Sequence, residues 1–323
     1  MKYLAFLAYI AIAGFSVAQD MRTVTDDLGN VIEIPVSPQR IVAVRSDCMA
    51  TPLVELGAPM VGAGSMQSDN FNGGRPFIRG ATQFYGTQFG DDLANIGFIN
   101  EPDIEVIASL EPDLILIASW VADSYDNLSK IAPTYAADCF GKPLTEWLGE
   151  IADLAGMSDV YDAKMAAYEL KLEHARAVLQ DSIGDPSEVT VVFADPFPDG
   201  IYVAEDYGTF TVVADALGFN RKTMTEDMLG DEGMLSPELV EAIDSDFIFS
   251  SYQVFFDQPA SQRLEQWQTL VPGFDELLHA PRNNQLVIID RSLIRAFAID
   301  GLETMISVLV SQVAERDFIP LED

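Results

Sequence analysis

Arginine and aromatic side chains follow several of the predicted strands, at the point where each strand ends. Arg45 and Ser46 come directly after the apolar segment 41–44, and Trp120 and Tyr125 follow the apolar segment 114–118. Because open parallel sheets bind ligands beyond the carboxyl ends of their strands, these positions are candidates for binding. The second half of the chain offers six more: Phe197, Tyr202, Tyr207, Tyr252, Arg291 and Arg295.

Such a set favours recognition of a ligand over its chemical conversion. Aromatic rings and guanidinium groups provide walls for an organic ligand and balance a negative charge on it. The same aromatic side chains could instead complete a hydrophobic core, since strand ends often carry them. For any single residue the sequence leaves both interpretations open.

The usual catalytic and metal-binding patterns do not occur in the sequence. The segment Gly62-Ala-Gly64-Ser65 lacks the later residues of a phosphate-binding loop or a nucleophile elbow. The two histidines, His174 and His279, are too few for a His-rich zinc or manganese site. The 51 acidic residues guarantee accidental carboxylate pairs. We therefore predict no enzyme, no cofactor and no direct protein–metal site.

The N-terminus has the pattern of an export signal. Lys2 precedes the apolar segment 3–15, and the small residues Ser16-Val17-Ala18 provide a cleavage site before Gln19. The apolar run is too short for a membrane-spanning helix. No cysteine lies near the cleavage site, so a lipoprotein is not expected. We predict a signal peptide at residues 1–18 and a free, exported product.

The chain is strongly acidic, with 51 acidic residues against 18 basic ones and a formal net charge of −33. A field of that sign repels nucleic acids and anionic lipids, so neither is expected as a partner. Salt adaptation remains an open explanation for the acidity. The two cysteines, Cys48 and Cys139, each follow a predicted strand and could meet at one sheet edge. In an oxidising compartment a disulfide between them and a pair of free thiols both remain open.

The segment 158–182 predicts one long amphipathic helix, because it contains no Gly or Pro and has a continuous apolar stripe. Ser158 is the expected N-cap, and Gly184 with Pro186 ends the helix. At 1.5 Å per residue the helix is roughly 35 to 40 Å long, about the width of a domain. The stripe consists of Tyr161, Met165, Tyr168, Leu172, Ala175 and Leu179.

The sequence repeats itself across this helix. The segment 103–116 aligns without a gap with the segment 236–249, and each reads as a helix, an acidic turn and a buried strand. Further strands and helices correspond in the same order, and helices alternate with strands throughout. We therefore predict an α/β fold with two similar lobes, 19–157 and 183–323, each with a mainly parallel central sheet. One long rigid helix at 158–182 joins them.

Four motifs occur in order along the first half of the chain: the segment 29–41 with Pro38-Gln-Arg40, Leu53-Val-Glu-Leu-Gly57, the segment 103–116 and Ile131-Ala-Pro133-Thr134. In this combination the chain resembles the helical-backbone class (class III) of periplasmic ABC-transporter substrate-binding proteins. The likeness covers essentially the whole mature chain and is specific to the family, though not to one ligand. It implies two α/β lobes joined by one long helix, with the ligand held in the cleft and little hinge motion.

The resemblance also implies a partner. Proteins of this class dock on the permease of an ABC importer through one acidic residue on each lobe. The matching positions are Glu105 and Glu238, which the internal repeat pairs independently. Two solvated surface glutamates without a docking role remain the alternative.

Members of this class carry ferric siderophores, haem or vitamin B12 through the periplasm. We expect a periplasmic, monomeric carrier of a ferric siderophore, because such a chelate supplies its own oxygen donors to iron. A haem or corrinoid carrier is the alternative, and Tyr125, Tyr207 or Tyr252 would then be a candidate axial ligand for haem. From other classes, an exported α/β hydrolase lacks a visible nucleophile elbow, and an acidic scaffold protein would use the long helix as a spacer.

Overall fold

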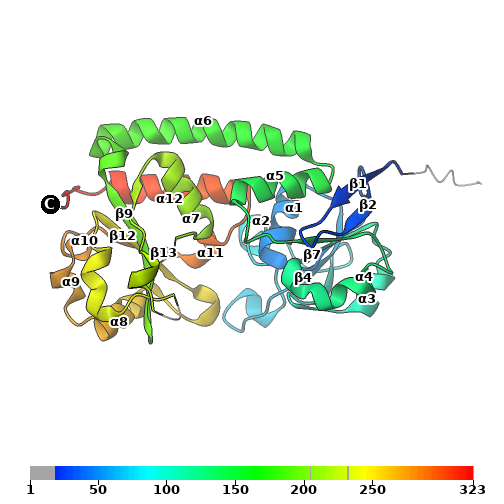
Figure 1. Cartoon of the computed structure of the whole chain (residues 1–323), viewed down its shortest axis with the longest axis horizontal. Helices are drawn as coiled ribbons and strands as arrows, with labels where there is room; N and C mark the ends of the chain where they lie inside the picture. The colour runs from blue at the N-terminus through cyan, green and yellow to red at the C-terminus, as the bar shows by residue number, and fades with distance from the viewer. Residues whose placement is uncertain (1–18, 204, 231–232, 323) are drawn as a thin grey trace, which may run out of the picture.

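The computed structural model describes residues 19–203, 205–230 and 233–322. Two lobes lie side by side beneath one long helix, α6 (Ser158–Ile183), as Figure 1 shows. The predicted α/β fold with two lobes joined by a long helix is thereby confirmed. The predicted signal peptide, residues 1–18, lies outside the described residues.

The N-terminal lobe is built on a six-stranded sheet in the order β6-β5-β4-β3-β7-β8, with all neighbours parallel except β5 and β6. Every residue of β7 is buried, as expected for an apolar strand covered on both faces. The strands are β3 (Ile41–Ala43), β4 (Met60–Ser65), β5 (Ala94–Phe98), β6 (Glu101–Pro102), β7 (Leu114–Ala118) and β8 (Thr134–Ala137). The helices are η1 (Ser46–Ala50), α1 (Thr51–Leu56), η2 (Asn72–Gly74), α2 (Ala81–Tyr85), α3 (Ile104–Ser109), η3 (Ser119–Ser124), α4 (Tyr125–Leu128) and α5 (Leu144–Leu154).

The C-terminal lobe has a sheet in the order β10-β9-β12-β13, and β11 also pairs with β9. All of these pairs are parallel except β10 with β9. The strands are β9 (Thr190–Phe197), β10 (Gly200–Val203), β11 (Asn220–Arg221), β12 (Phe247–Tyr252) and β13 (Leu286–Asp290). The helices are η4 (Pro186–Glu188), α7 (Gly208–Leu217), η5 (Glu226–Met228), η6 (Pro237–Ile243), η7 (Val254–Phe256), α8 (Ala260–Leu270), α9 (Phe274–Leu277), α10 (His279–Arg282), α11 (Arg291–Ile294) and α12 (Ile299–Ala314).

The sequence repeat corresponds to a repeat in topology, because β3-β7-β8 and β9-β12-β13 are parallel triplets in the same order. In each triplet an aspartate before the middle strand fixes the start of the first strand. The Asp113 carboxylate accepts the N–H groups of Gln39 and Arg40 at 2.7 and 2.8 Å. The Asp246 carboxylate accepts the N–H of Thr190 at 2.7 Å. The helix before the middle strand differs between the copies: α3 is α-helical, whereas its counterpart η6 is a 3-10 helix kinked at Leu239.

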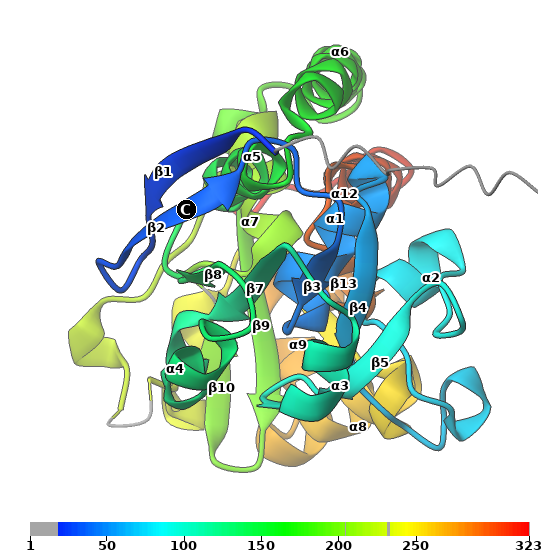
Figure 2. The ribbon, with the colours of Figure 1, turned by 90° about the vertical axis from the view of Figure 1, so that its right-hand side faces the viewer.

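Helix α6 does not cross open solvent between the lobes. Its apolar side packs on α12, α5 and α7, and it buries Tyr168, Leu172, Ala175 and Leu179. Figure 2 shows α6 end-on, with α5 and α12 between it and the sheets. One continuous hydrophobic cluster therefore includes residues of both lobes, such as Trp147 and Leu309.

The predicted N-cap role of Ser158 is wrong. The helix begins at Ser158 itself, and the N-cap residue Met157 makes no side-chain capping bond. The reason is that α5 turns directly into α6: the Met157 N–H donates to the carbonyl of Ala152 at 2.7 Å. Gly156 makes this turn with φ +69°, and a Cβ there would lie 2.9 Å from the carbonyl oxygen of Val36.

An antiparallel hairpin, β1 (Met21–Thr25) and β2 (Val31–Pro35), precedes the first lobe. Its turn covers the edge strand β8, because the Asp27 N–H donates to the carbonyl of Ala136 at 3.0 Å. Among the described residues, no helix combines the length and the apolar character that a bilayer span requires.

Cys48 and Cys139 form a disulfide in the structure, with their Cα atoms 6.2 Å apart. It joins η1, which follows β3, to the segment that follows β8. The Trp147 indole N–H donates to the carbonyl of Cys48 at 2.6 Å, so α5 packs against the same junction.

We expect the substitution Leu179→Ala to lower the free energy of unfolding by about 2 to 5 kcal/mol, because Leu179 lies on the inner face of α6 and is fully buried. The matched control is Leu170→Ala on the outer face of the same helix, where the side chain is 70% exposed. We expect the control to change stability by less than about 0.5 kcal/mol. Urea unfolding of both variants tests this. Equal decreases in the free energy of unfolding would contradict a stabilising role of the buried stripe.

We expect the double substitution Cys48→Ser and Cys139→Ser to lower the free energy of unfolding by about 2 to 5 kcal/mol, because the bond closes a long loop. Urea unfolding of the variant and of the dithiothreitol-reduced protein should give the same midpoint, below that of the oxidised protein. Coinciding midpoints for all three samples would contradict a stabilising bond.

Candidate ligand-binding cleft

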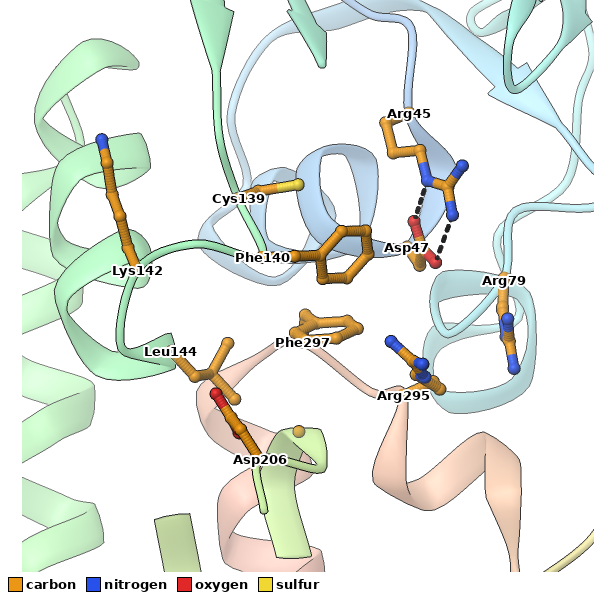
Figure 3. Close-up of a pocket in the computed structure, with 11 residues that line it drawn as sticks. Arg45, Asp47, Arg79, Cys139, Phe140, Lys142, Leu144, Asp206, Arg295 and Phe297 are labelled. Atoms are coloured by element: carbon orange, nitrogen blue, oxygen red, sulfur yellow. Dashed lines mark hydrogen bonds and ion pairs between the residues drawn. The ribbon is translucent and has the colours of Figure 1, made fainter. Parts of the chain in front are cut away.

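A cavity of about 350 Å³ lies between the two lobes. The N-terminal lobe lines it with Arg45, Asp47, Arg79, Cys139, Phe140, Lys142 and Leu144, and the C-terminal lobe with Asp206, Gly208, Arg295 and Phe297. Figure 3 shows Phe140 and Phe297 in the middle, with the three arginines on one side and Lys142, Leu144 and Asp206 on the other. Neither lobe alone forms this cavity.

The N-terminal wall begins where the buried strand β3 ends. Arg45 leaves this strand, and its guanidinium pairs with Asp47, with 2.6 Å between Nε and Oδ1. Burial raises the pKa of Asp47, but the Arg45 ion pair, helped by Arg79, outweighs it and holds the pKa below its ordinary value. The Arg45 Cζ also lies 5.6 Å from the ring centroid of Trp120 and 5.7 Å from that of Phe140.

Trp120 and Phe140 form an aromatic stack beside this pair, with ring centroids 5.3 Å apart. Phe140 also contacts Phe297 of the other lobe edge to face, at 5.5 Å. Trp120 is 45% exposed, whereas the other two tryptophans of the chain are buried. The stack therefore offers a ligand a partly open aromatic surface.

The C-terminal wall is formed by α11 and the segment after it. The Arg295 Cζ lies 5.6 Å from the ring centroid of Phe140 and 5.5 Å from that of Tyr207. The Arg291 Cζ lies 5.3 Å from the ring centroid of Tyr207. The Asp290 carboxylate accepts the N–H of Ser292 at 2.9 Å, which fixes the start of α11 at the end of β13.

Arg79 reaches the cavity from the loop before α2. Burial lowers the pKa of Arg79 to about 10. The negative charge of Asp47 raises this pKa, whereas the positive charges of Arg295 and Arg291 lower it further. Arg79 therefore stays charged at neutral pH. Its Cζ lies 5.9 Å from the ring of Phe255 in the other lobe. Phe71 and Phe77 contact that same ring at 4.8 and 5.0 Å, so the lobes also touch at this side of the cleft.

The four guanidinium groups of the cleft are incompletely neutralised. Within the described ranges, Asp47 pairs with Arg45, and no carboxylate forms an ion pair with Arg79, Arg291 or Arg295. The Nε atoms of Arg79 and Arg291 are buried and find no hydrogen-bond partner in the described part of the chain. Buried donors without partners are uncommon. Of these two residues, Arg79 belongs to the lining of the cavity.

The chemistry of this arrangement is anion recognition. Three unpaired cations beside aromatic rings attract negative charge strongly, because the surrounding protein screens less than water. In the part of the chain that the structure describes, no group of three or more His, Cys, Asp or Glu side chains is placed to hold a metal ion.

The structure brings together five of the residues predicted from strand ends. Arg45 and Arg295 line the cavity. Trp120 lies beside Arg45, and Tyr207 lies beside both Arg291 and Arg295. Tyr202 lies behind Tyr207, with ring centroids 5.8 Å apart.

Four predicted residues lie elsewhere. Ser46 is the first residue of η1 and is fully buried, and Tyr125 packs against the N-terminal core, where Asp26 faces its hydroxyl. Phe197 lines a different cavity beside α8, and Tyr252 ends β12 near Asp290. The strand-end rule fails for Ser46 and Tyr125 because the short helices that start there turn these side chains into the lobe.

Sequence reasoning missed Asp47, Arg79, Phe140 and Phe297. Phe140 could have been found, because it follows the predicted strand at 134–137 and adjoins Cys139. Asp47 follows Arg45 by two residues, yet an acidic side chain carries no signal in a chain with 51 of them. Arg79 and Phe297 come from loops that only the packed structure brings to the cleft.

The two candidate docking glutamates occupy equivalent places. Glu105 is exposed in the first turn of α3, and Glu238 is exposed in the first turn of η6. Each of these helices runs back to the start of the strand that follows it. Its first turn therefore lies toward the strand-end edge of its lobe, the edge that carries the cleft.

Comparison with known proteins places this architecture in a family. The family described as periplasmic binding protein matches residues 73–293. The iron(3+)-hydroxamate-binding protein YxeB of Bacillus subtilis is 28% identical over 246 residues, which cover 71% of this chain and 67% of that protein. The ferric enterobactin-binding periplasmic protein FepB of Escherichia coli is 29% identical over 170 residues, which cover 51% and 52%.

Solved structures agree with this assignment. The FhuD protein from S. pseudintermedius has a TM-score of 0.67 and 25% identity, covering 91% of this chain and 98% of that one. Staphylococcus aureus SirA, complexed with staphyloferrin B, has a TM-score of 0.70 at 21% identity, covering 90% and 98%. The chain therefore belongs to the periplasmic binding protein family, a family of substrate-binding proteins rather than enzymes, and has the helix-joined two-lobed fold of its class III members.

Proposed function

We propose that this protein captures a ferric siderophore of net negative charge in the cleft between its lobes and delivers it to the permease of an ABC importer. The observation that carries the proposal is that Arg45, Arg79 and Arg295 line one cavity together with aromatic rings. Arg291 adds a fourth guanidinium, which shares the ring of Tyr207 with Arg295. The protein would act as an exported monomer, cleaved before Gln19 and without a lipid anchor.

A ferric chelate suits this cleft because its iron is already coordinated by the chelate's own oxygens. The protein then needs no metal ligand, and it contributes cations for the net charge and rings for the organic backbone. The cavity volume of about 350 Å³ lies within the usual range for small-molecule sites. Relatives named for iron(3+)-hydroxamate and for ferric enterobactin support an iron chelate in general. A fold neighbour solved with staphyloferrin B supports it further.

Haem is less well supported as cargo. Tyr207 is the tyrosine closest to the cationic wall, but it is only 2% exposed. Burial raises the pKa of Tyr207 to about 12, although Arg291 and Arg295 lower it. That shift opposes the phenolate form that would ligate haem iron.

We expect anionic ferric enterobactin to quench the fluorescence of the exposed Trp120 at micromolar concentration, and neutral ferrichrome and cationic ferrioxamine B to bind at least about tenfold more weakly. The physical reason is the unpaired guanidinium charge in the cleft. Trp147 and Trp267 are fully buried, so Trp120 is the tryptophan that a bound chelate can contact directly. Equal affinity for all three chelates would contradict the charge assignment. The absence of quenching by all three chelates, or a Soret band on mixing with hemin, would contradict the siderophore assignment.

Two variants localise this binding. Arg79→Gln and Arg295→Gln should each weaken the anionic chelate by about tenfold or more. Arg22→Gln is the matched control, because Arg22 pairs with Asp153 on the outer surface of the N-terminal lobe. A loss in the control equal to that in the cleft variants would point to the overall charge of the protein instead of the cleft.

We expect Glu105→Arg and Glu238→Arg together to leave chelate affinity nearly unchanged and to abolish uptake by the cognate importer. Charge reversal on an exposed rim acts on encounter and on partner choice. Glu169→Arg on the exposed outer face of α6 serves as the control and should transport normally. Uptake of radioactive iron by cells carrying each variant measures the effect, and normal uptake by the double variant would rule out docking through these two residues.

A further inference from the structure

One buried carboxylate joins the two lobes beside the cleft. Glu55 belongs to α1 of the N-terminal lobe, and its side chain is only 1% exposed. The carboxylate accepts the N–H of Ile299 at 2.7 Å and the N–H of Asp300 at 2.6 Å, both at the start of α12. The first N–H groups of a helix have no partner within it, so one carboxylate with two oxygens satisfies two of them.

The connecting helix takes part in the same contact. Lys164 of α6 lies 2.8 Å from the Asp300 carboxylate and 3.4 Å from that of Glu55. Tyr85 of α2 is the other titratable group that faces this site. We call the group of Glu55, Lys164 and the start of α12 the clasp, because it ties α1, α6 and α12 together at one point.

The clasp sits directly behind both walls of the cleft. Helix α1 continues η1, which begins just after Arg45 and contains Asp47. Helix α12 begins two residues after Phe297 and four after Arg295. The clasp therefore fixes the two chain segments that carry the cationic and aromatic groups of the cleft, although Glu55 itself does not line the cavity.

We propose that Glu55 is a positioning residue for ligand binding, which sets the distance between the arginine-bearing walls of the two lobes by holding the start of α12. Only the part of this inference that concerns ligand affinity rests on the proposed function. A buried charge is a poor way to gain stability, because apolar packing of similar volume usually does as well. Two directed hydrogen bonds to one carboxyl group instead fix one relative position of two helices.

The energetics of the clasp make it detectable without a ligand. Burial raises the pKa of Glu55 to about 7. The two amide hydrogen bonds and Lys164 lower this pKa, but burial outweighs them, and the negative charge of the nearby Asp300 adds to the rise. In an opened clasp Glu55 would be solvated, with its ordinary pKa of 4.5. Protonation therefore favours the closed clasp, and opening becomes easier as the pH rises from 4.5 through 7.

The first experiment measures hydrogen exchange of the Ile299 and Asp300 amides at pH 6 and pH 8, each relative to its intrinsic rate. From these pKa values we expect protection to fall about tenfold between the two pH values. In Glu55→Gln we expect no such fall. Asp26→Asn is the matched control, because Asp26 is also a buried carboxylate that accepts backbone N–H groups, those of Leu28, Asn30 and Ala136, but within one lobe. Equal protection of the two amides in the wild-type protein and in Glu55→Gln at both pH values would overturn the proposal.

The second experiment measures the positions of the walls and the affinity. Spin labels on Asp91→Cys and Glu265→Cys, exposed residues of opposite lobes, should give a broader distance distribution in Glu55→Gln than in Asp26→Asn. Affinity for ferric enterobactin should fall by about fivefold or more in Glu55→Gln and stay unchanged in Asp26→Asn. An unchanged distance distribution, or unchanged affinity in a protein that binds the chelate, would overturn the positioning role. If the wild-type protein binds no chelate, the proposed function fails. The exchange and distance measurements still test whether Glu55 holds the start of α12.

Discussion

The rest of the structure depends on the burial of one face of α6. Its stripe of large side chains, each contributing about 1.5 to 3 kcal/mol when buried, must be covered along the whole helix. The chain covers it with α5 from one lobe and α7 and α12 from the other. Both lobes therefore share one hydrophobic core, and their relative position is set by packing instead of by a free linker.

A shared core of this kind places the two repeats so that their strand-end edges meet. Each repeat begins with a strand whose start is held by the aspartate before the next strand, Asp113 in one lobe and Asp246 in the other. Some of the residues after the strands, Arg45 and Arg295 among them, then line the space between the lobes. The disulfide between Cys48 and Cys139 fixes one side of that space, since both cysteines adjoin residues that line the cavity.

The electrostatics of the cleft oppose those of the protein as a whole. The chain has a net charge of −33, yet the cleft concentrates guanidinium groups and leaves three of them without a carboxylate partner in the described residues. Such clustering is unfavourable in the empty protein, because Arg291 and Arg295 lower the pKa of Arg79 together with burial. An anionic ligand would relieve this repulsion inside the cleft, whereas the acidic exterior would repel it from the rest of the surface.

The sequence by itself determined the class of fold, the long helix and the internal repeat, because each rests on a local pattern: the spacing of Leu172 and Leu179, the unbroken apolar run of β7, or the paired aspartates. It also determined Arg45, Trp120 and Arg295 as residues of the cleft, since a residue that directly follows a strand or its short helix stays near the sheet edge. Only the tertiary structure showed that the two cysteines are bonded and that Ser46 and Tyr125 turn into the N-terminal lobe. It alone placed Arg79 and Phe297 in the lining of the cleft. It alone revealed the bond from Glu55 to the start of α12, because partners 244 residues apart leave no local pattern and meet only when both lobes pack on one core.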